Sequence, residues 1–89
     1  AVEEIVENGF SLTLYPNPAQ DYLNISVTGL SCKEAFAYIY DTGGCLVSLV
    51  PVDDSTTTIR TEGLSSGLYF LRVACEDQIA TGAFVVSGR

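Results

Sequence analysis

Few side chains in this sequence are able to act as catalysts. The 89 residues include no histidine, so no Ser-His or Cys-His pair can form and no imidazole can serve as a general base. Adjacent acids occur at Asp53-Asp54 and Glu76-Asp77. A glycoside hydrolase needs two carboxyl groups held across a cleft, whereas these pairs fall in predicted loops of a chain too short for a deep cleft. We therefore expect solvated turn residues, no catalytic residue and no enzymatic activity.

The sequence also lacks the usual patterns for binding metals or cofactors. The three cysteines, Cys32, Cys45 and Cys75, form no Cys-x-x-Cys pair, and there is no histidine to complete a zinc site. No Asp-x-Asp-x-Asp-Gly run is present for calcium. An odd number of cysteines leaves at least one thiol unpaired, and the sequence does not select the pair for a single disulfide. We predict no metal site and no cofactor.

Strong acidity restricts the partners. The formal net charge at pH 7 is −7, and nucleic acids and anionic membrane surfaces repel such a chain. No apolar run reaches the roughly 18 residues of a membrane-spanning helix. We expect no nucleic-acid partner and no direct insertion into a membrane.

Alternation of apolar and polar residues predicts short β-strands and no helix. It is clearest in residues 21–28, where Leu23, Ile25 and Val27 would share an inward face. Asp41-Thr42-Gly43-Gly44 predicts a hairpin, and Pro51 is expected to end its return strand. The predicted strands cover residues 10–14, 21–28, 35–40, 45–50, 56–61, 68–75 and 78–86.

Residues 63–73 are expected to organise these strands. Gly63 and Gly67 bracket a turn that leads into the most apolar strand of the sequence. In that strand Tyr69, Leu71 and Val73 would face the core. Tyr69, near the start of a late strand, also suits the corner tyrosine of immunoglobulin-like domains.

The pattern predicts an all-β fold, an immunoglobulin-like antiparallel β-sandwich of about seven short strands. The Cys…Trp…Cys signature of antibody domains is absent, so this likeness is one of architecture. Residues 1–9 carry three glutamates with little pattern and are expected to be a linker, which leaves residues 10–89 as the domain.

Four motifs, in this order and spacing, carry a resemblance to a known family. They are residues 15–25, which begin with Tyr15-Pro16-Asn17-Pro18, residues 39–44, residues 64–73 and residues 81–86. Together they resemble the type A C-terminal sorting domain of proteins exported by the type IX (Por) secretion system of Bacteroidetes. The resemblance runs from about Phe10 to the C-terminus.

The resemblance implies a folded export signal at the end of a cargo protein. Cargo of this family reaches the periplasm by an ordinary signal peptide, and the outer-membrane translocon then recognises the sorting domain. A cell-surface sortase of the cysteine-protease type usually removes the domain and often joins the cargo to a lipopolysaccharide anchor. The implied partners are the translocon, the sortase and an N-terminal cargo domain. The implied location is the periplasm in transit, then the cell surface or the extracellular space.

The resemblance also assigns positions to recognition by the translocon. Cleavage is expected in the acidic linker, residues 1–9, because processing needs accessible chain. The family usually has a lysine where this chain has Ala83, so the signal would be weaker here or would rely on Arg89 near the end. The recognition positions carried over from the family motifs are Pro16, Asn17, Pro18, Gly67, Tyr69, Thr81, Phe84, Val85, Val86 and Arg89.

Two alternative functions and one assembly question stay open on the sequence alone. A carbohydrate-binding or adhesive sandwich would use exposed aromatic residues as its platform, with Tyr22, Phe36, Tyr38 and Tyr40 as candidates. A passive spacer would stand between other domains. Self-association into a homodimer is neither indicated nor excluded.

Overall fold

The computed structural model describes residues 3–7, 10–30, 34–53, 55–76 and 78–87. In these ranges the chain forms eight β-strands and no helix. Apart from β1, the strands match the predicted ones in order and nearly in length. They are β1 (Glu3–Glu7), β2 (Phe10–Tyr15), β3 (Tyr22–Thr28), β4 (Ala35–Tyr40), β5 (Leu46–Val52), β6 (Thr56–Arg60), β7 (Gly67–Cys75) and β8 (Gln78–Val86).

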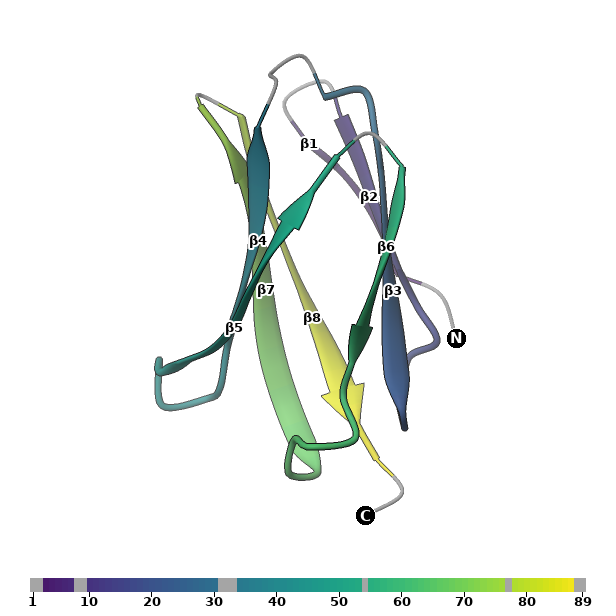
Figure 1. Ribbon diagram of the computed structural model, residues 1–89, viewed down its shortest axis with the longest axis vertical. Helices are drawn as coiled ribbons and strands as arrows, with labels where there is room; N and C mark the ends of the chain where they lie inside the picture. Colours follow the sequence, from purple (N-terminus) through teal and green to yellow (C-terminus); the bar gives the residue numbers. More distant parts are fainter. Residues whose placement is uncertain (1–2, 8–9, 31–33, 54, 77, 88–89) are drawn as a thin grey trace.

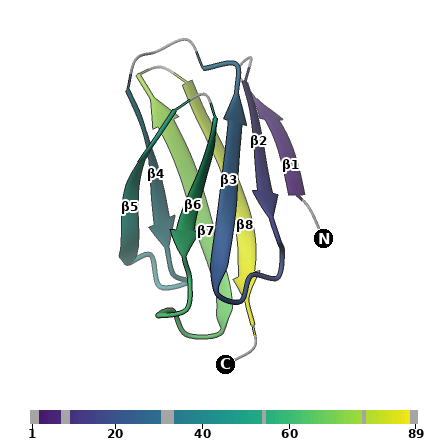
Figure 2. The same ribbon diagram turned by 45° about the vertical axis from the view of Figure 1, so that its right-hand side comes forward.

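The strands form two antiparallel sheets that pack face to face (Figures 1 and 2). One sheet has the order β1-β2-β3-β6 and the other the order β5-β4-β7-β8. The chain therefore changes sheet after β3, after β5 and after β6. This arrangement confirms the predicted all-β, immunoglobulin-like antiparallel sandwich.

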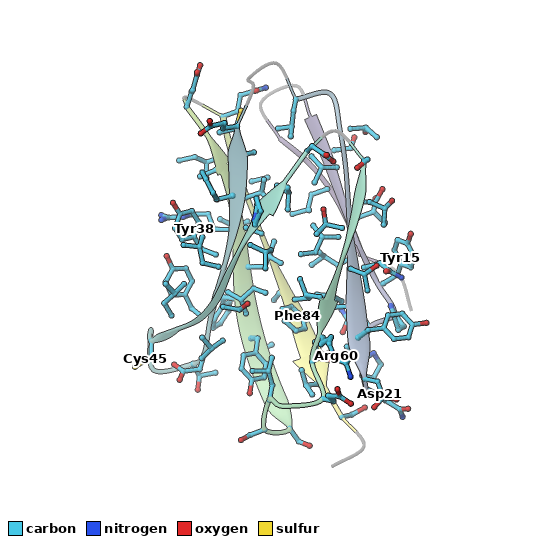
Figure 3. All side chains as sticks on the ribbon, viewed as in Figure 1. Tyr15, Asp21, Tyr38, Cys45, Arg60 and Phe84 are labelled. Carbon is cyan, nitrogen blue, oxygen red and sulfur yellow. The ribbon has the colours of Figure 1, made fainter. Side chains whose placement is uncertain are left out.

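Apolar residues at every second position of the strands build the core between the sheets. Leu23, Ile25 and Val27 of β3 are fully buried, as the alternation predicts. On the facing sheet β7 buries its own alternating set. Figure 3 shows Phe84 of β8 between the sheets, where it is fully buried. The inward residues of β7 are Tyr69, Leu71, Val73 and Cys75.

The outer face of the β1-β2-β3-β6 sheet is polar where its side chains are described. Thr58 Oγ1 donates a hydrogen bond to Asn24 Oδ1 at 2.6 Å, and Thr56 Oγ1 donates to Ser26 Oγ at 3.3 Å. Arg60 forms an ion pair with Glu62. Side chains of directly paired residues share one face of a sheet. We call this surface the polar face; by register it comprises Ser11, Thr13, Tyr15, Tyr22, Asn24, Ser26, Thr28, Thr56, Thr58 and Arg60, among which Tyr22 is a large exposed aromatic residue.

The outer face of the β5-β4-β7-β8 sheet is apolar instead. Among the described residues, every exposed large hydrophobic side chain except Tyr22 belongs to these four strands. Figure 3 shows Tyr38 on the outer side of β4, away from Phe84. We call this surface the apolar face; by register it comprises Phe36, Tyr38, Tyr40, Leu46, Leu49, Pro51, Leu68, Phe70, Arg72, Ala74, Ile79, Thr81, Ala83 and Val85.

Two expectations from the sequence are corrected by the structure. Irregular linker was expected over residues 1–9, but Glu3–Glu7 form β1, which pairs with β2 from Glu3↔Leu14 to Glu7↔Phe10. Pro51 was expected to end its strand, yet β5 continues to Val52. Proline is tolerated there because β5 is an edge strand, so an N–H can be missing on its open side.

The predicted hairpin connects β4 and β5. Asp41 Oδ1 accepts hydrogen bonds from the backbone N–H of Gly43 at 2.9 Å and of Cys45 at 3.0 Å, which closes the turn between β4 and β5.

The structure gives the state of two of the three cysteines. Cys45 is free and exposed, whereas the buried Cys75 is disulfide-bonded. Cys32 lies outside the described residues.

Candidate recognition site

The Pro16-Asn17-Pro18 turn leaves β2 and is bound to the end of β8 in the opposite sheet. Asn17 Oδ1 accepts a hydrogen bond from the Val85 N–H at 3.0 Å. The Ala19 N–H donates to the Val85 carbonyl at 2.7 Å, and the Ser87 N–H donates to the Ala19 carbonyl at 2.8 Å. Both X-Pro bonds, Tyr15–Pro16 and Asn17–Pro18, are cis. The turn is therefore held to the last strand by side-chain and backbone contacts.

A second anchor holds the same segment to the residue that follows β6. Thr61 is fully buried, and its Oγ1 donates a hydrogen bond to the Gln20 carbonyl at 3.0 Å. The Thr61 N–H donates to the Asp21 carbonyl at 2.9 Å. A buried hydroxyl without a partner would be costly, so this contact fixes where the segment runs. The sequence prediction missed Thr61, because in the alternation it is simply the last residue of a predicted strand.

Tyr69 has the geometry predicted for a corner tyrosine. Its hydroxyl donates a hydrogen bond to the Ser65 carbonyl, four residues upstream, at 2.7 Å. Its ring stacks against that of Phe84 with centroids 5.7 Å apart, and the side chain is only 6% exposed. Gly67 starts the strand with a φ of 149°, a value that L side chains rarely adopt. The turn before β7 is thus tied to β7 itself.

Strand pairing brings all four motifs to one end of the sandwich, since Tyr40, just before the turn at residues 41–44, pairs with Phe70. Gly67 pairs with Val86 and Tyr69 pairs with Phe84. The Pro16-Asn17-Pro18 turn is bound to Val85, as described above. Figure 2 shows the segment after β2, the connection between β6 and β7, and the end of β8 at the same, lower end. We call this end the motif end.

One predicted recognition position, Thr81, and the departing position Ala83 lie away from the contacts of the Pro16-Asn17-Pro18 turn. Thr81 pairs with Arg72 midway along β7 and β8, on the apolar face. Ala83, which stands where the family usually has lysine, pairs with Phe70 on the same face. Arg89 lies outside the described residues.

The predicted recognition positions differ in burial, and only the exposed ones can contact a partner of the folded domain. Tyr69, Phe84 and Val86 are buried, so they support the fold and cannot contact a partner while the domain is folded. Pro16, Pro18 and Thr81 are exposed, as is Val85 at 39%. The exposed prolines border a shallow hollow of about 260 Å³ beside Asp21 and Tyr22. That volume is below the roughly 300–1,000 Å³ of ordinary ligand pockets.

The charged groups near this end are few. The Glu62 carboxylate accepts a hydrogen bond from Arg60 Nε at 2.8 Å, and this bond together with the charge of Glu62 raises the pKa of Arg60. Among the described residues, no cluster of three or more histidine, cysteine or acidic side chains could hold a metal ion.

The aromatic platform considered for carbohydrate binding is divided between the sheets. Phe36, Tyr38 and Tyr40 lie on the apolar face, but Tyr22 begins β3 in the other sheet. The four rings therefore do not form one surface.

Within the described ranges, the structure contains no helix that is long and apolar enough to cross a bilayer.

The fold and the clustered motifs define the class of this protein as a small immunoglobulin-like β-sandwich domain. A family model, the secretion system C-terminal sorting domain, matches residues 13–87. The chain therefore belongs to that family, as the four motifs predict. No curated protein matches the chain at a significant level.

Membership in this family gives the general function of the domain. The domain is a C-terminal sorting signal for type IX secretion, so it directs export to the cell surface or the extracellular space. It acts together with the type IX secretion machinery and with a cargo region on its N-terminal side.

Proposed function

We propose that the outer-membrane translocon recognises this folded domain through its motif end while the cargo is in the periplasm. A surface sortase then removes the domain and joins the cargo to a lipopolysaccharide anchor or releases it. The domain itself carries out no chemistry. In this proposal the exposed residues Pro16, Pro18 and Val85 contact the translocon, and the buried motif residues hold them in place.

One observation supports the proposal most directly. Motifs that are far apart in the sequence meet at the motif end, where Asn17 and Ala19 are hydrogen-bonded to Val85. The contacts fix two exposed prolines next to the last strand. A partner can read this arrangement only when the domain is folded, because unfolding separates the prolines from Val85.

Processing is proposed to take place within residues 1–9. The pairing of β1 with β2 adds a condition to this step, since a protease needs an accessible backbone. β1 is an edge strand with one neighbour, so it can detach without opening the rest of its sheet. We therefore propose that β1 leaves β2 before the sortase cuts.

A fusion experiment tests the proposed function. A folded fluorescent reporter with a periplasmic signal peptide is placed upstream of residues 1–89. The fusion is expressed in a bacterium with a working type IX system and in a translocon-deficient sister strain. We expect surface or extracellular reporter, with the domain removed, in the competent strain alone. Intact fusion in the periplasm of both strains would contradict the proposal.

A further inference from the structure

The apolar face departs from the pattern of an ordinary sandwich. An antiparallel sheet usually packs one side on the core and presents polar side chains to water on the other. The polar face follows this rule, but the apolar face does not. Phe70 is 44% exposed and Leu49 is 49% exposed, although both lie in the middle of β-strands. Contiguous exposed apolar surface of this kind is typical of an interaction site.

Arg72 is the only charged residue among the paired strand residues that define the apolar face. Glu34 and Glu76 border this face beside Phe36, Tyr38 and Ala74. Arg72 is flanked by Tyr38 on β4 and Thr81 on β8. Its guanidinium lies over the Tyr38 ring, 5.2 Å from the centroid, and Nη2 donates a hydrogen bond to Tyr40 Oη at 3.4 Å. The ion pair found within the described ranges belongs to Arg60 and Glu62, so no described carboxylate neutralises Arg72.

A hollow adjoins this arginine. It measures about 500 Å³, is open to solvent, and is lined by Tyr40, Phe70, Arg72, Thr81, Gly82 and Ala83. The small residues Gly82 and Ala83 leave space beside the larger rings of Tyr40 and Phe70. The hollow can accept an apolar side chain next to a group that pairs with the guanidinium.

From these features we propose that the apolar face docks a protein surface of the secretion machinery that inserts an apolar side chain beside Phe70 and presents a carboxylate to Arg72. This inference rests on the proposed function and adds a second contact surface to the motif end. Arginine in an aromatic setting is well suited to such a carboxylate, because its planar guanidinium can donate two parallel hydrogen bonds. Val85 belongs to both surfaces, so the two are continuous.

Other occupants fit the face less well. A second copy of the chain would bring another −7 charge and another unpaired Arg72. The residues of the face are also fewer than the roughly 20–30 per side of a stable protein interface, which suits a transient contact. The aromatic platform considered for a carbohydrate is incomplete on this face, because Tyr22 lies in the other sheet.

The test uses the reporter fusion with charge variants of Arg72. We expect Arg72→Lys to be exported less well than the parent chain because it loses the paired donors, Arg72→Gln less well again, and Arg72→Glu at least about tenfold less. Thr56→Glu is the control, since it adds a glutamate to the polar face at the end of β6 that lies away from the motif end. Thr58→Asp is a second control there. Urea unfolding of the purified domains checks that each variant is folded.

A second variant probes the apolar contact without changing Arg72. Phe70→Ser removes the ring beside the hollow, and its exposure allows the domain to remain folded. We expect reduced export of Phe70→Ser. We also expect that parent domain co-expressed in the periplasm competes with the reporter for export, whereas Arg72→Glu domain competes about tenfold less.

The outcomes separate the two proposals. If the parent fusion is exported and the folded Arg72→Gln, Arg72→Glu and Phe70→Ser fusions are exported equally well, the docking inference is wrong and the proposed function stands. If the parent fusion is not exported, both are wrong. Arg72-dependent binding of polygalacturonate by the purified domain, or dimerisation that Arg72→Glu abolishes, would assign the face to another occupant and overturn the inference.

Discussion

At the scale of single residues, the motif positions divide into two groups with different tasks. Tyr69 donates its hydroxyl hydrogen to Ser65, and Asn17 uses its side-chain oxygen to accept from Val85. Both polar groups are thus engaged inside the domain. Pro16 and Pro18 have no such internal role and remain exposed. A mutation at Tyr69 should therefore act on stability, and a mutation at the prolines on recognition.

Tyr69 gives the first prediction. Tyr69→Ala is expected to lower the free energy of unfolding by about 3–5 kcal/mol, because it empties a large space beside Phe84. Tyr69→Phe keeps the ring and loses the hydrogen bond to Ser65, at a cost of about 1 kcal/mol. Urea unfolding measures both. A loss below about 1 kcal/mol for Tyr69→Ala would show that the ring is not part of the core.

Asn17 gives the second prediction. Asn17→Ala removes the acceptor of the Val85 N–H, which costs about 1 kcal/mol and speeds hydrogen exchange of that amide about fivefold. Asn17→Asp keeps an acceptor oxygen and should leave the exchange rate near that of the parent. Amide exchange followed by NMR reports on this single contact. Unchanged exchange in Asn17→Ala would mean that the contact does not hold the strand.

At the scale of elements, the turn between β2 and β3 behaves as a small unit with its own attachments. Ala19 is fully buried and bridges to Val86, while Thr61 binds the carbonyls of Gln20 and Asp21. These attachments do not involve the proline rings. The path of the turn therefore depends on the backbone around it more than on the two rings that it exposes.

This independence gives the third prediction. Replacing Pro16 and Pro18 together by alanine removes both exposed rings, and urea unfolding of the purified double variant checks that the domain remains folded. Export of the reporter fusion should fall strongly, because the exposed rings are lost. A matched double variant on the polar face, Thr56→Ala with Thr58→Ala, should be exported normally. Full export of the proline variant would reduce the turn to a structural role.

The sequence predicts elements better than the contacts between them. Alternation identified β2 to β8 because Leu23, Ile25 and Val27, like Tyr69, Leu71 and Val73, alternate with outward residues. β1 was missed because Glu3–Glu7 shows no clear alternation, and its pairing with β2 relies on backbone hydrogen bonds. The bonds from Ala19 and Ser87 are likewise backbone contacts, which leave no signature in side-chain types.

The candidate site was predicted to a similar degree. The motif residues were named from the sequence as a group, but which of them are buried could not be read without the pairing of β7 with β8. The apolar face could have been recognised earlier. Leu68, Phe70 and Ala74 alternate with the core-facing residues of the same strand, and an apolar set on that side is itself the signal.

At the scale of the whole molecule, the two outer surfaces have opposite character. The polar face carries threonines, serines and an ion pair, while the apolar face carries exposed rings and aliphatic side chains around one arginine. The net charge of −7 opposes contact between copies of the chain. The apolar face favours such contact once that charge is screened.

Ionic strength therefore gives the fourth prediction. At low salt the isolated domain should sediment as a monomer, because repulsion between like charges acts over distances longer than about 10 Å below 0.1 M salt. Near 1 M salt self-association should increase, and Phe70→Ser should suppress it. Sedimentation velocity measures both. A stable dimer at low salt that persists on dilution would contradict this prediction and assign the apolar face to a second copy.

The position of β1 has a consequence for the cargo. β1 lies at the edge of the sheet opposite the apolar face, as Figures 1 and 2 show. Cargo joined through β1 is therefore attached to the sheet that does not carry the apolar face. We expect docking on that face to depend little on the size of the passenger.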